Sequence, residues 1–196
     1  MGILDALRGS KLRSPGSVRH KGAKVSDILA THQQFVRGES GGKRADLSGA
    51  DLSRIDFGGA NLMYADCAGA NLEGASFRDA KLTHSDLSGC QLRGADLRRA
   101  DCTESNFSGA DMTEAQIGGA ELFRANLSGA ILRRADCGVA NFRDADVAGA
   151  VFEGANLKAA ILRETKLDGV DLSGVDLSTA LLPPGYNAKQ AVPKSE

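Results

Sequence analysis

The chain has 196 residues, a formal net charge of −1 and 24 glycines, but no tryptophan and only 5% aromatic residues. A chain of this length can enclose one hydrophobic core, and with so few aromatic residues Leu and Ala have to fill it. No apolar run approaches the roughly 18 residues of a membrane span, and the first residues lack the apolar stretch of a signal peptide. These features exclude a membrane-spanning protein and predict a cytoplasmic one.

Residues 1–24 form a basic arm in front of an acidic body. Residues 1–44 hold nine Lys or Arg against three Asp or Glu, whereas residues 45–179 hold thirteen against twenty-one. An acidic body does not suit a reader of nucleic acid, because phosphates attract a basic face. We expect the arm to be disordered. The alternative is weak contact with an anionic membrane surface, since Ile3, Leu4 and Leu7 precede its basic residues.

Residues 25–37 have the pattern of an amphipathic helix. Ser26 is a suitable N-cap and Gly38 a suitable stop. The apolar stripe of the helix consists of Val25, Ile28, Leu29, His32, Phe35 and Val36. We therefore assign residues 25–44 as a capping helix with its linker.

From Ala45 to Thr179 the sequence repeats every five residues, through twenty-seven pentads without an insertion or a deletion. The centre of the pentad is Leu in sixteen copies and Phe in five. Ala stands two residues before the centre in twenty copies, and Asp or Asn stands one residue before it in eighteen. Gly stands two residues after the centre in thirteen copies.

A period of five fits neither an α-helix nor a continuous strand. In a helix the apolar centres would rotate by about 140° per repeat, and in a strand they would alternate between the two faces. Two inward side chains spaced two apart instead define a short extended segment. The Gly suits the second central position of a type II turn, which requires a positive φ. Each pentad is therefore predicted to be a short strand followed by a turn.

The pentads ADLSG, ANLEG, ADLRR and ANLSG resemble the A(D/N)LXX motif of the pentapeptide-repeat family, and the resemblance covers about two-thirds of the chain. It implies an all-β solenoid, a right-handed quadrilateral parallel β-helix of about seven coils, with four pentads in each coil. Coils stack at about 4.8 Å, the spacing of neighbouring strands. The short helix at residues 25–37 would cap the N-terminal end of this stack.

The interior of such a coil is narrow, which explains the Ala at the second inward position. The expected core consists of Leu47, Leu52, Phe57, Leu62, Leu72, Phe77, Leu97, Phe107, Leu127, Phe142, Phe152 and Leu172. Cys67, Cys90, Cys102 and Cys137 also occupy inward positions and have no CxxC spacing. We interpret them as small apolar fillers rather than as disulfide partners or metal ligands.

Every fourth pentad belongs to the same face of the expected coil. On the first face all seven turns carry Gly, and a vertical row of carboxylates, here called the acid row, offers a candidate mimic of DNA: Asp46, Asp66, Asp86 and Asp146. The fourth face is rougher. Its outward residues include a candidate partner surface, here called the aromatic patch: Met63, Tyr64, His84, Phe123 and Arg124.

Residues 180–196 replace the repeat. Pro183 and Pro184 cannot continue a hydrogen-bonded ladder. We expect Leu181, Leu182 and Tyr186 to fold over the last coil, and residues 187–196 to form a loose tail.

The sequence predicts no enzyme, because it has no phosphate-binding loop and its three histidines lie in the arm, the helix and one wall. No catalytic, cofactor or metal residues are therefore assigned. The preferred interpretation is a protein-interaction scaffold or adaptor with an unknown protein partner. The resemblance implies an alternative, a DNA-mimicking protein that binds DNA gyrase and protects it from quinolones. A third reading is a spacer targeted by the basic arm. The rod would be a monomer or an end-to-end dimer.

Overall fold

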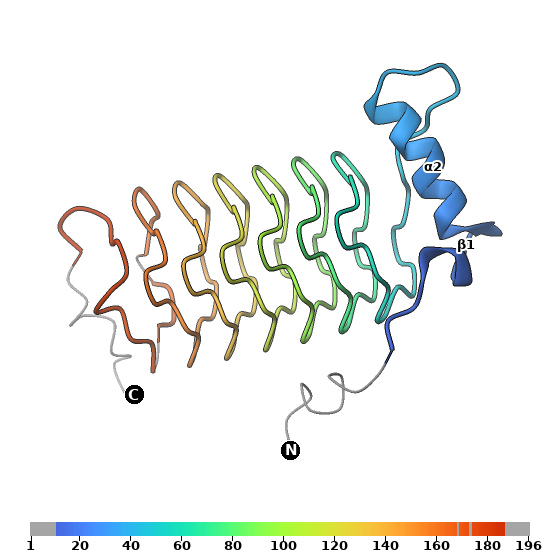
Figure 1. The fold of residues 1–196 in the computed structure, drawn as a ribbon. Coiled ribbons are helices and arrows are strands. Elements are labelled where there is room, and N and C mark those ends of the chain that lie inside the picture. Colours follow the sequence, from blue (N-terminus) through green and yellow to red (C-terminus); the bar gives the residue numbers. More distant parts are fainter. Residues whose placement is uncertain (1–10, 168, 173, 187–196) are drawn as a thin grey trace.

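The structure is a computed structural model that describes residues 11–167, 169–172 and 174–186. Most of these residues form a stack of similar coils, and one helix lies across the N-terminal end of the stack (Figure 1). The regular elements before the stack are the 3₁₀-helix η1 (Pro15–Ser17), the strands β1 (Arg19–His20) and β2 (Ala23–Lys24), and the helix α2 (Val25–Val36). β1 and β2 form an antiparallel pair.

The coils are held together by parallel backbone bridges between residues twenty positions apart, such as Asp46 with Asp66 and Asp66 with Asp86. In one bridge the Leu47 N–H donates to the Asp66 carbonyl at 2.7 Å, and the Asp66 N–H donates to the Ala45 carbonyl at 2.9 Å. Such bridges recur at five-residue steps along the chain. Four pentads therefore complete one circuit, and the solenoid has four faces.

A β-turn joins each pentad to the next. In the first, the Ala50 N–H donates to the Leu47 carbonyl at 3.2 Å, and the second central residue, Gly49, has a φ of 64°. A positive φ at this position alone is the signature of a type II turn. Among the described residues of the repeat, thirteen other than glycine adopt the same conformation, including Val139 with a φ of 52°.

The inward side chains form one continuous core. All twelve residues of the expected core are buried, and the rings of Phe57 and Phe77 stack with centroids 5.2 Å apart. The four cysteines are buried and free. Burial raises the pKa of the Cys90 thiol to about 12, and the Cys90 Sγ donates to the Cys67 carbonyl at 2.9 Å. These thiols pack as small apolar groups.

Helix α2 packs against the first coil. Val25 and His32 are fully buried, and Ile28 and Leu29 pack against the core. The prediction that Ser26 caps this helix is wrong. The N-cap is Lys24, without a side-chain hydrogen bond, and the Val25 N–H instead donates to the Val18 carbonyl at 2.8 Å. The preceding segment supplies a backbone acceptor, so the helix begins earlier than its sequence suggests.

Residues 11–24 differ from the disordered arm that their composition predicts. Arg13 forms a parallel bridge with Ile55: its N–H donates to the Arg54 carbonyl at 2.7 Å, and its carbonyl accepts from the Asp56 N–H at 2.9 Å. The physical reason is that the first coil has no preceding coil to pair with, and Arg13 fills that role for one rung. The apolar residues Ile3, Leu4 and Leu7 lie outside the described residues, so membrane contact stays a prediction.

The repeat extends one pentad further than expected. Leu181 bridges to Ile161, its N–H donates to the Ala160 carbonyl at 2.9 Å, and its carbonyl accepts from the Leu162 N–H at 2.8 Å. The prolines do not interrupt this ladder because they follow Leu181.

The chain then turns through Pro184 and Gly185. The Tyr186 N–H donates to the Pro183 carbonyl at 3.1 Å, and Gly185 has a φ of 78°. Leu182 and Tyr186 pack against the core, whereas Leu181 is 44% exposed. The expected tail, residues 187–196, lies outside the described residues. Among those that are described, no helix is long and apolar enough to cross a membrane.

Candidate interaction surface

The fourth face carries a column of large side chains at the second central position of its turns. Its six members, here called the fourth-face column, are Tyr64, His84, Glu104, Arg124, Asp144 and Glu164. All six have a φ between 54° and 65°. A non-glycine residue in this left-handed conformation costs about 1 kcal/mol or more. On the first face the corresponding positions are all glycine, so the fourth face tolerates a strain that the first face avoids.

The N-terminal half of the column is a stacked pair joined to a carboxylate. The rings of Tyr64 and His84 lie 5.1 Å apart at an interplanar angle of 10°. His84 Nδ1 lies 3.3 Å from Glu104 Oε2, and this pair is ionic when the imidazole is protonated. Tyr64 is 42% exposed. One face of the Tyr64 ring is therefore exposed to solvent, and the opposite face stacks on the His84 ring.

The C-terminal half is built around one aromatic ring. The guanidinium carbons of Arg124 and Arg143 each lie 4.9 Å from the centroid of the Phe123 ring, a cation–π geometry. Arg124 Nε donates to Asp144 Oδ2 at 2.8 Å, and Arg143 Nε lies 3.3 Å from Glu164 Oε2. The Asp144 hydrogen bond raises the pKa of the Arg124 guanidinium. The Phe123 ring is thus associated with two ion-paired cations.

The structure brings the predicted aromatic patch together in two parts. Tyr64 contacts His84, and Phe123 contacts Arg124, with Glu104 between the two pairs in the column. Met63 is half-buried on the same edge as Tyr64. Sequence reasoning missed the column's ionic members, Glu104, Asp144 and Glu164, and also Arg143. The signal was present, because opposite charges recur at twenty-residue spacing on this face.

The acid row also forms a vertical row on the first face, but its carboxylates are engaged. Oδ1 of Asp46, Asp66, Asp86 and Asp146 each accepts a hydrogen bond from the backbone N–H two residues later. Such bonds close an Asx turn. The row is therefore in part a structural element of the strand-to-turn junction.

Two members of the acid row also have a cation beside them. Lys21 Nζ donates to Asp46 Oδ2 at 2.5 Å, and Arg44 lies 3.7 Å from Asp66. The hydrogen bond from Lys21, together with those from Ser48, holds the pKa of Asp46 well below its usual range. The basic segment 11–44 therefore offsets part of the negative charge at the N-terminal end of the first face.

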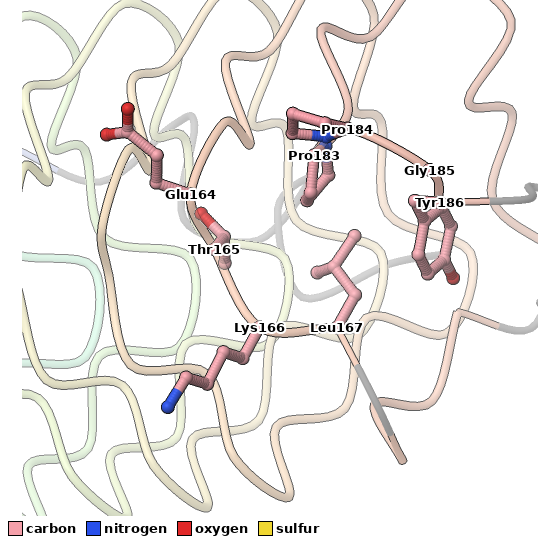
Figure 2. Close-up of a pocket in the computed structure, with 8 residues that line it drawn as sticks. All are labelled: Glu164, Thr165, Lys166, Leu167, Pro183, Pro184, Gly185 and Tyr186. Atoms are coloured by element: carbon pink, nitrogen blue, oxygen red, sulfur yellow. The ribbon is translucent and has the colours of Figure 1, made fainter.

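Polar and titratable groups do not converge in the part of the chain that the structure describes. It contains no cluster of three His, Cys, Asp or Glu side chains that could hold a metal ion. A hollow of about 390 Å³ lies at the C-terminal end, where Leu167, Pro183, Pro184 and Tyr186 form an apolar wall (Figure 2). Thr165 also lines it, but its hydroxyl donates to the Phe142 carbonyl at 2.6 Å. The hollow therefore presents apolar side chains on one wall, and the Thr165 hydroxyl is engaged by a backbone carbonyl rather than activated as a nucleophile.

The fold and the surface define a class of protein: a β-solenoid that presents columns of side chains on flat walls. A family model described as pentapeptide repeats matches residues 43–79, 75–114, 120–158 and 140–178. The chain therefore belongs to the pentapeptide repeat family, and its four-sided solenoid is the right-handed quadrilateral β-helix of that family. No curated protein sequence matches the chain.

Several solved structures are similar to this chain. HetL, a pentapeptide repeat protein involved in heterocyst differentiation regulation in Nostoc sp. strain PCC 7120, is 35% identical over 74% of this chain and 73% of its own, with a TM-score of 0.48. A pentapeptide repeat protein of the Arabidopsis thaliana thylakoid lumen is 34% identical over 62% of this chain and 64% of its own, with a TM-score of 0.33. QnrB1, a plasmid-mediated fluoroquinolone resistance protein, is 21% identical over 70% of this chain and 83% of its own, with a TM-score of 0.31.

Proposed function

We propose that this protein is a non-enzymatic interaction scaffold, a capped rod of about seven coils whose fourth face is recognised by a protein partner. The observation that carries the proposal is the fourth-face column together with Phe123 and Arg143. Tyr and Arg are among the side chains that most often dominate binding energy at interfaces. Here they are held in place before any partner arrives, by stacking of Tyr64 on His84 and by the ion pair of Arg124 with Asp144.

Side chains that are ordered before binding favour a higher affinity. Immobilising a flexible side chain on binding costs about 0.5–1.5 kcal/mol, and side chains that are already ordered by their neighbours avoid part of that cost. The same argument explains the strained turns of the fourth-face column. Their left-handed conformation costs folding free energy, but it places six side chains in one line where a partner can contact them.

Binding to DNA gyrase is the alternative, and it draws on the acid row. It has less support, because Asp46 and Asp66 have cations beside them and duplex DNA carries one charge per about 1.7 Å. A supercoiling assay with a quinolone tests it directly. Rescue of gyrase by the wild-type protein that is lost in Asp86→Asn/Asp146→Asn would establish this alternative, and absence of rescue by the wild type would exclude it.

A targeting role for the basic arm also has less support. Lys21 is engaged by Asp46, and Arg13 bridges to the first coil. Basic side chains that pair within the protein contribute less to attraction by an anionic membrane surface. Residues 11–24 are better explained as part of the N-terminal cap than as an anchor.

Affinity capture from cells that produce the protein tests the interaction role. The double variant Tyr64→Ser/Phe123→Ser should lose the partners that the wild-type protein retains, since it removes both aromatic anchors of the fourth face. The matched control is Val139→Ser, which removes an apolar side chain that is 62% exposed on the third face. Unchanged capture by the double variant, or equal loss in the control, would contradict the proposal.

A further inference from the structure

We propose that the fourth face also pairs with a second copy of this chain, with the two rods side by side and antiparallel. The inference rests on the proposed function, because it uses the same face. The two-fold axis would pass between the rungs of Glu104 and Arg124. A two-fold interface is self-complementary, so each contact occurs twice.

The order of side chains in the fourth-face column carries the argument. The column runs Tyr64, His84, Glu104, Arg124, Asp144, Glu164, with one residue in each coil. Reversal of this order about the proposed axis places Glu104 of each copy opposite Arg124 of the other. The same operation places the imidazole of His84 opposite the carboxylate of Asp144, and the hydroxyl of Tyr64 opposite the carboxylate of Glu164. Each of these three pairs joins a donor or a cation to an anion.

Three other arrangements lack this complementarity. An axis at the rung of Glu104 places that carboxylate against its own copy. An axis at the rung of Arg124 places that guanidinium against its own copy and Glu104 against Asp144. Parallel rods would place every member of the column against itself. Because like charges in contact disfavour a complex, the charge pattern disfavours these three arrangements, whereas the proposed register joins all six members of the column in complementary pairs.

The adjacent column of turn residues is compatible with the same axis. Its members are Met63, Thr83, Thr103, Phe123, Arg143 and Arg163. Reversal places Thr103 opposite Phe123, and Thr83 opposite Arg143, so no two like charges meet. The intramolecular ion pairs can persist as well, since a guanidinium has five N–H donors and the hydrogen bond from Arg124 to Asp144 uses Nε.

The expected affinity is low. Six rungs at about 4.8 Å make a short, narrow strip. The area buried by two such strips falls below the roughly 1,200 Å² at which stable interfaces begin. We therefore expect a reversible dimer with a Kd of about 10–500 µM, assembled on the fourth face.

Sedimentation velocity of the purified full chain from about 5 to 1,000 µM, a range that brackets this Kd, provides the test. The wild-type protein should shift from monomer towards dimer across this range. Arg124→Glu and Glu104→Arg should each raise Kd by about tenfold or more, since each places like charges opposite one another twice.

An equimolar mixture of these two variants should recover a heterodimer. The glutamate introduced by Arg124→Glu then faces the arginine introduced by Glu104→Arg, and the unchanged Glu104 of the first variant faces the unchanged Arg124 of the second. Both contacts join opposite charges again. This rescue occurs only in the proposed register.

The matched control is Arg99→Glu on the third face, which also sits at a left-handed turn position (φ 57°) and forms an ion pair with Asp79 at 2.7 Å. It should not change the dimer. Circular dichroism confirms that each variant is folded. If a charge-reversal variant is not, Arg124→Gln or Glu104→Gln replaces it at the same position. A wild-type protein that stays monomeric throughout, or variants that fail to rescue one another, would overturn the pairing. If Tyr64→Ser/Phe123→Ser still loses captured partners in that case, the interaction function stands and only self-pairing fails.

Discussion

His32 Nδ1 accepts a hydrogen bond from the backbone N–H of Ala45 at 3.1 Å, joining helix α2 to the first residue of the repeat. The imidazole is fully buried, and its Nε2 has no hydrogen-bond partner among the residues that the structure describes. Burial lowers the pKa of His32, the Met63 backbone opposes this effect in part, and the charge of Arg44 adds to it. Helix α2 is thus attached to the first coil through an imidazole whose lowered pKa favours the neutral form.

Acidification should therefore weaken the attachment of helix α2 to the first coil. The pKa of His32 is lower in the folded state than its value of about 6.5 in an unfolded chain. The unfolded state then binds more protons, so stability rises with pH across this interval. The contribution of His32 is fully present above about pH 6.5 and is lost as the pH falls through the folded-state pKa. Urea unfolding at a series of pH values between about 7.5 and 5 measures the slope.

His32→Asn provides the comparison, because an amide can accept a hydrogen bond but does not titrate in this range. It should cost about 1–3 kcal/mol at neutral pH through imperfect replacement of a buried acceptor, and it should flatten the pH dependence. A variant that keeps the wild-type slope would show that another group is responsible.

A charge in the core should break the stack of coils. Leu97 is fully buried at the centre of its pentad, so Leu97→Ala should cost about 2–5 kcal/mol. Leu97→Asp should cost more, because an unpaired carboxylate has to be buried or the coil has to open. Thermal unfolding followed by far-ultraviolet circular dichroism compares the stability of the two variants with that of the wild-type protein. Val139→Asp, at an exposed turn position, is the control and should keep the stack intact. A Leu97→Asp protein as stable as the wild type would contradict the assignment of the core.

The period of five residues predicts the coil because every pentad imposes the same local constraints on the backbone. Leu, Phe and Ala at two inward positions, and Gly at a position that needs a positive φ, leave few other backbone paths. The sequence could not show that Arg13 pairs with Ile55, because composition alone describes a basic segment as solvated. Nor could it show that Leu181 continues the ladder, because the two prolines that follow suggest an earlier end.

The sequence indicates only some residues of the candidate surface. Tyr64 and Phe123 stand out in the sequence as large residues at outward positions. Their partners do not, since Glu104 and Arg143 look like ordinary surface charges until the twenty-residue register brings them to the same face. The register is a property of four pentads together, and pairwise contacts along it depend on side-chain conformation that a sequence pattern does not specify.

Hydrogen bonding, rather than charge, should explain the preference for Asp or Asn before the centre of each pentad. Asp146 Oδ1 accepts from the Ala148 N–H at 3.0 Å, and Asn126 Oδ1 accepts from the Ser128 N–H at the same distance. Asp146→Asn keeps this acceptor and should change the free energy of unfolding by less than about 0.5 kcal/mol. Asp146→Ala removes it and should cost about 0.5–1.5 kcal/mol. Denaturant titration of the two variants distinguishes them, and equal losses would indicate that the carboxylate charge matters.

Strain at the turns should be measurable at Val139. This β-branched residue has a φ of 52° and is 62% exposed, so little packing compensates for its conformation. Val139→Gly should raise the free energy of unfolding by about 1 kcal/mol, because the relief of left-handed strain exceeds the added flexibility of the unfolded chain. The converse substitution, which introduces a side chain at a left-handed position, is Gly129→Ala. Gly129 has a φ of 66°, and a Cβ there would meet nothing within 4 Å, so its expected loss of about 1 kcal/mol would come from the backbone alone. Opposite signs for the two variants in urea unfolding are the expected result, and a destabilised Val139→Gly would show that the exposed valine makes a compensating contact.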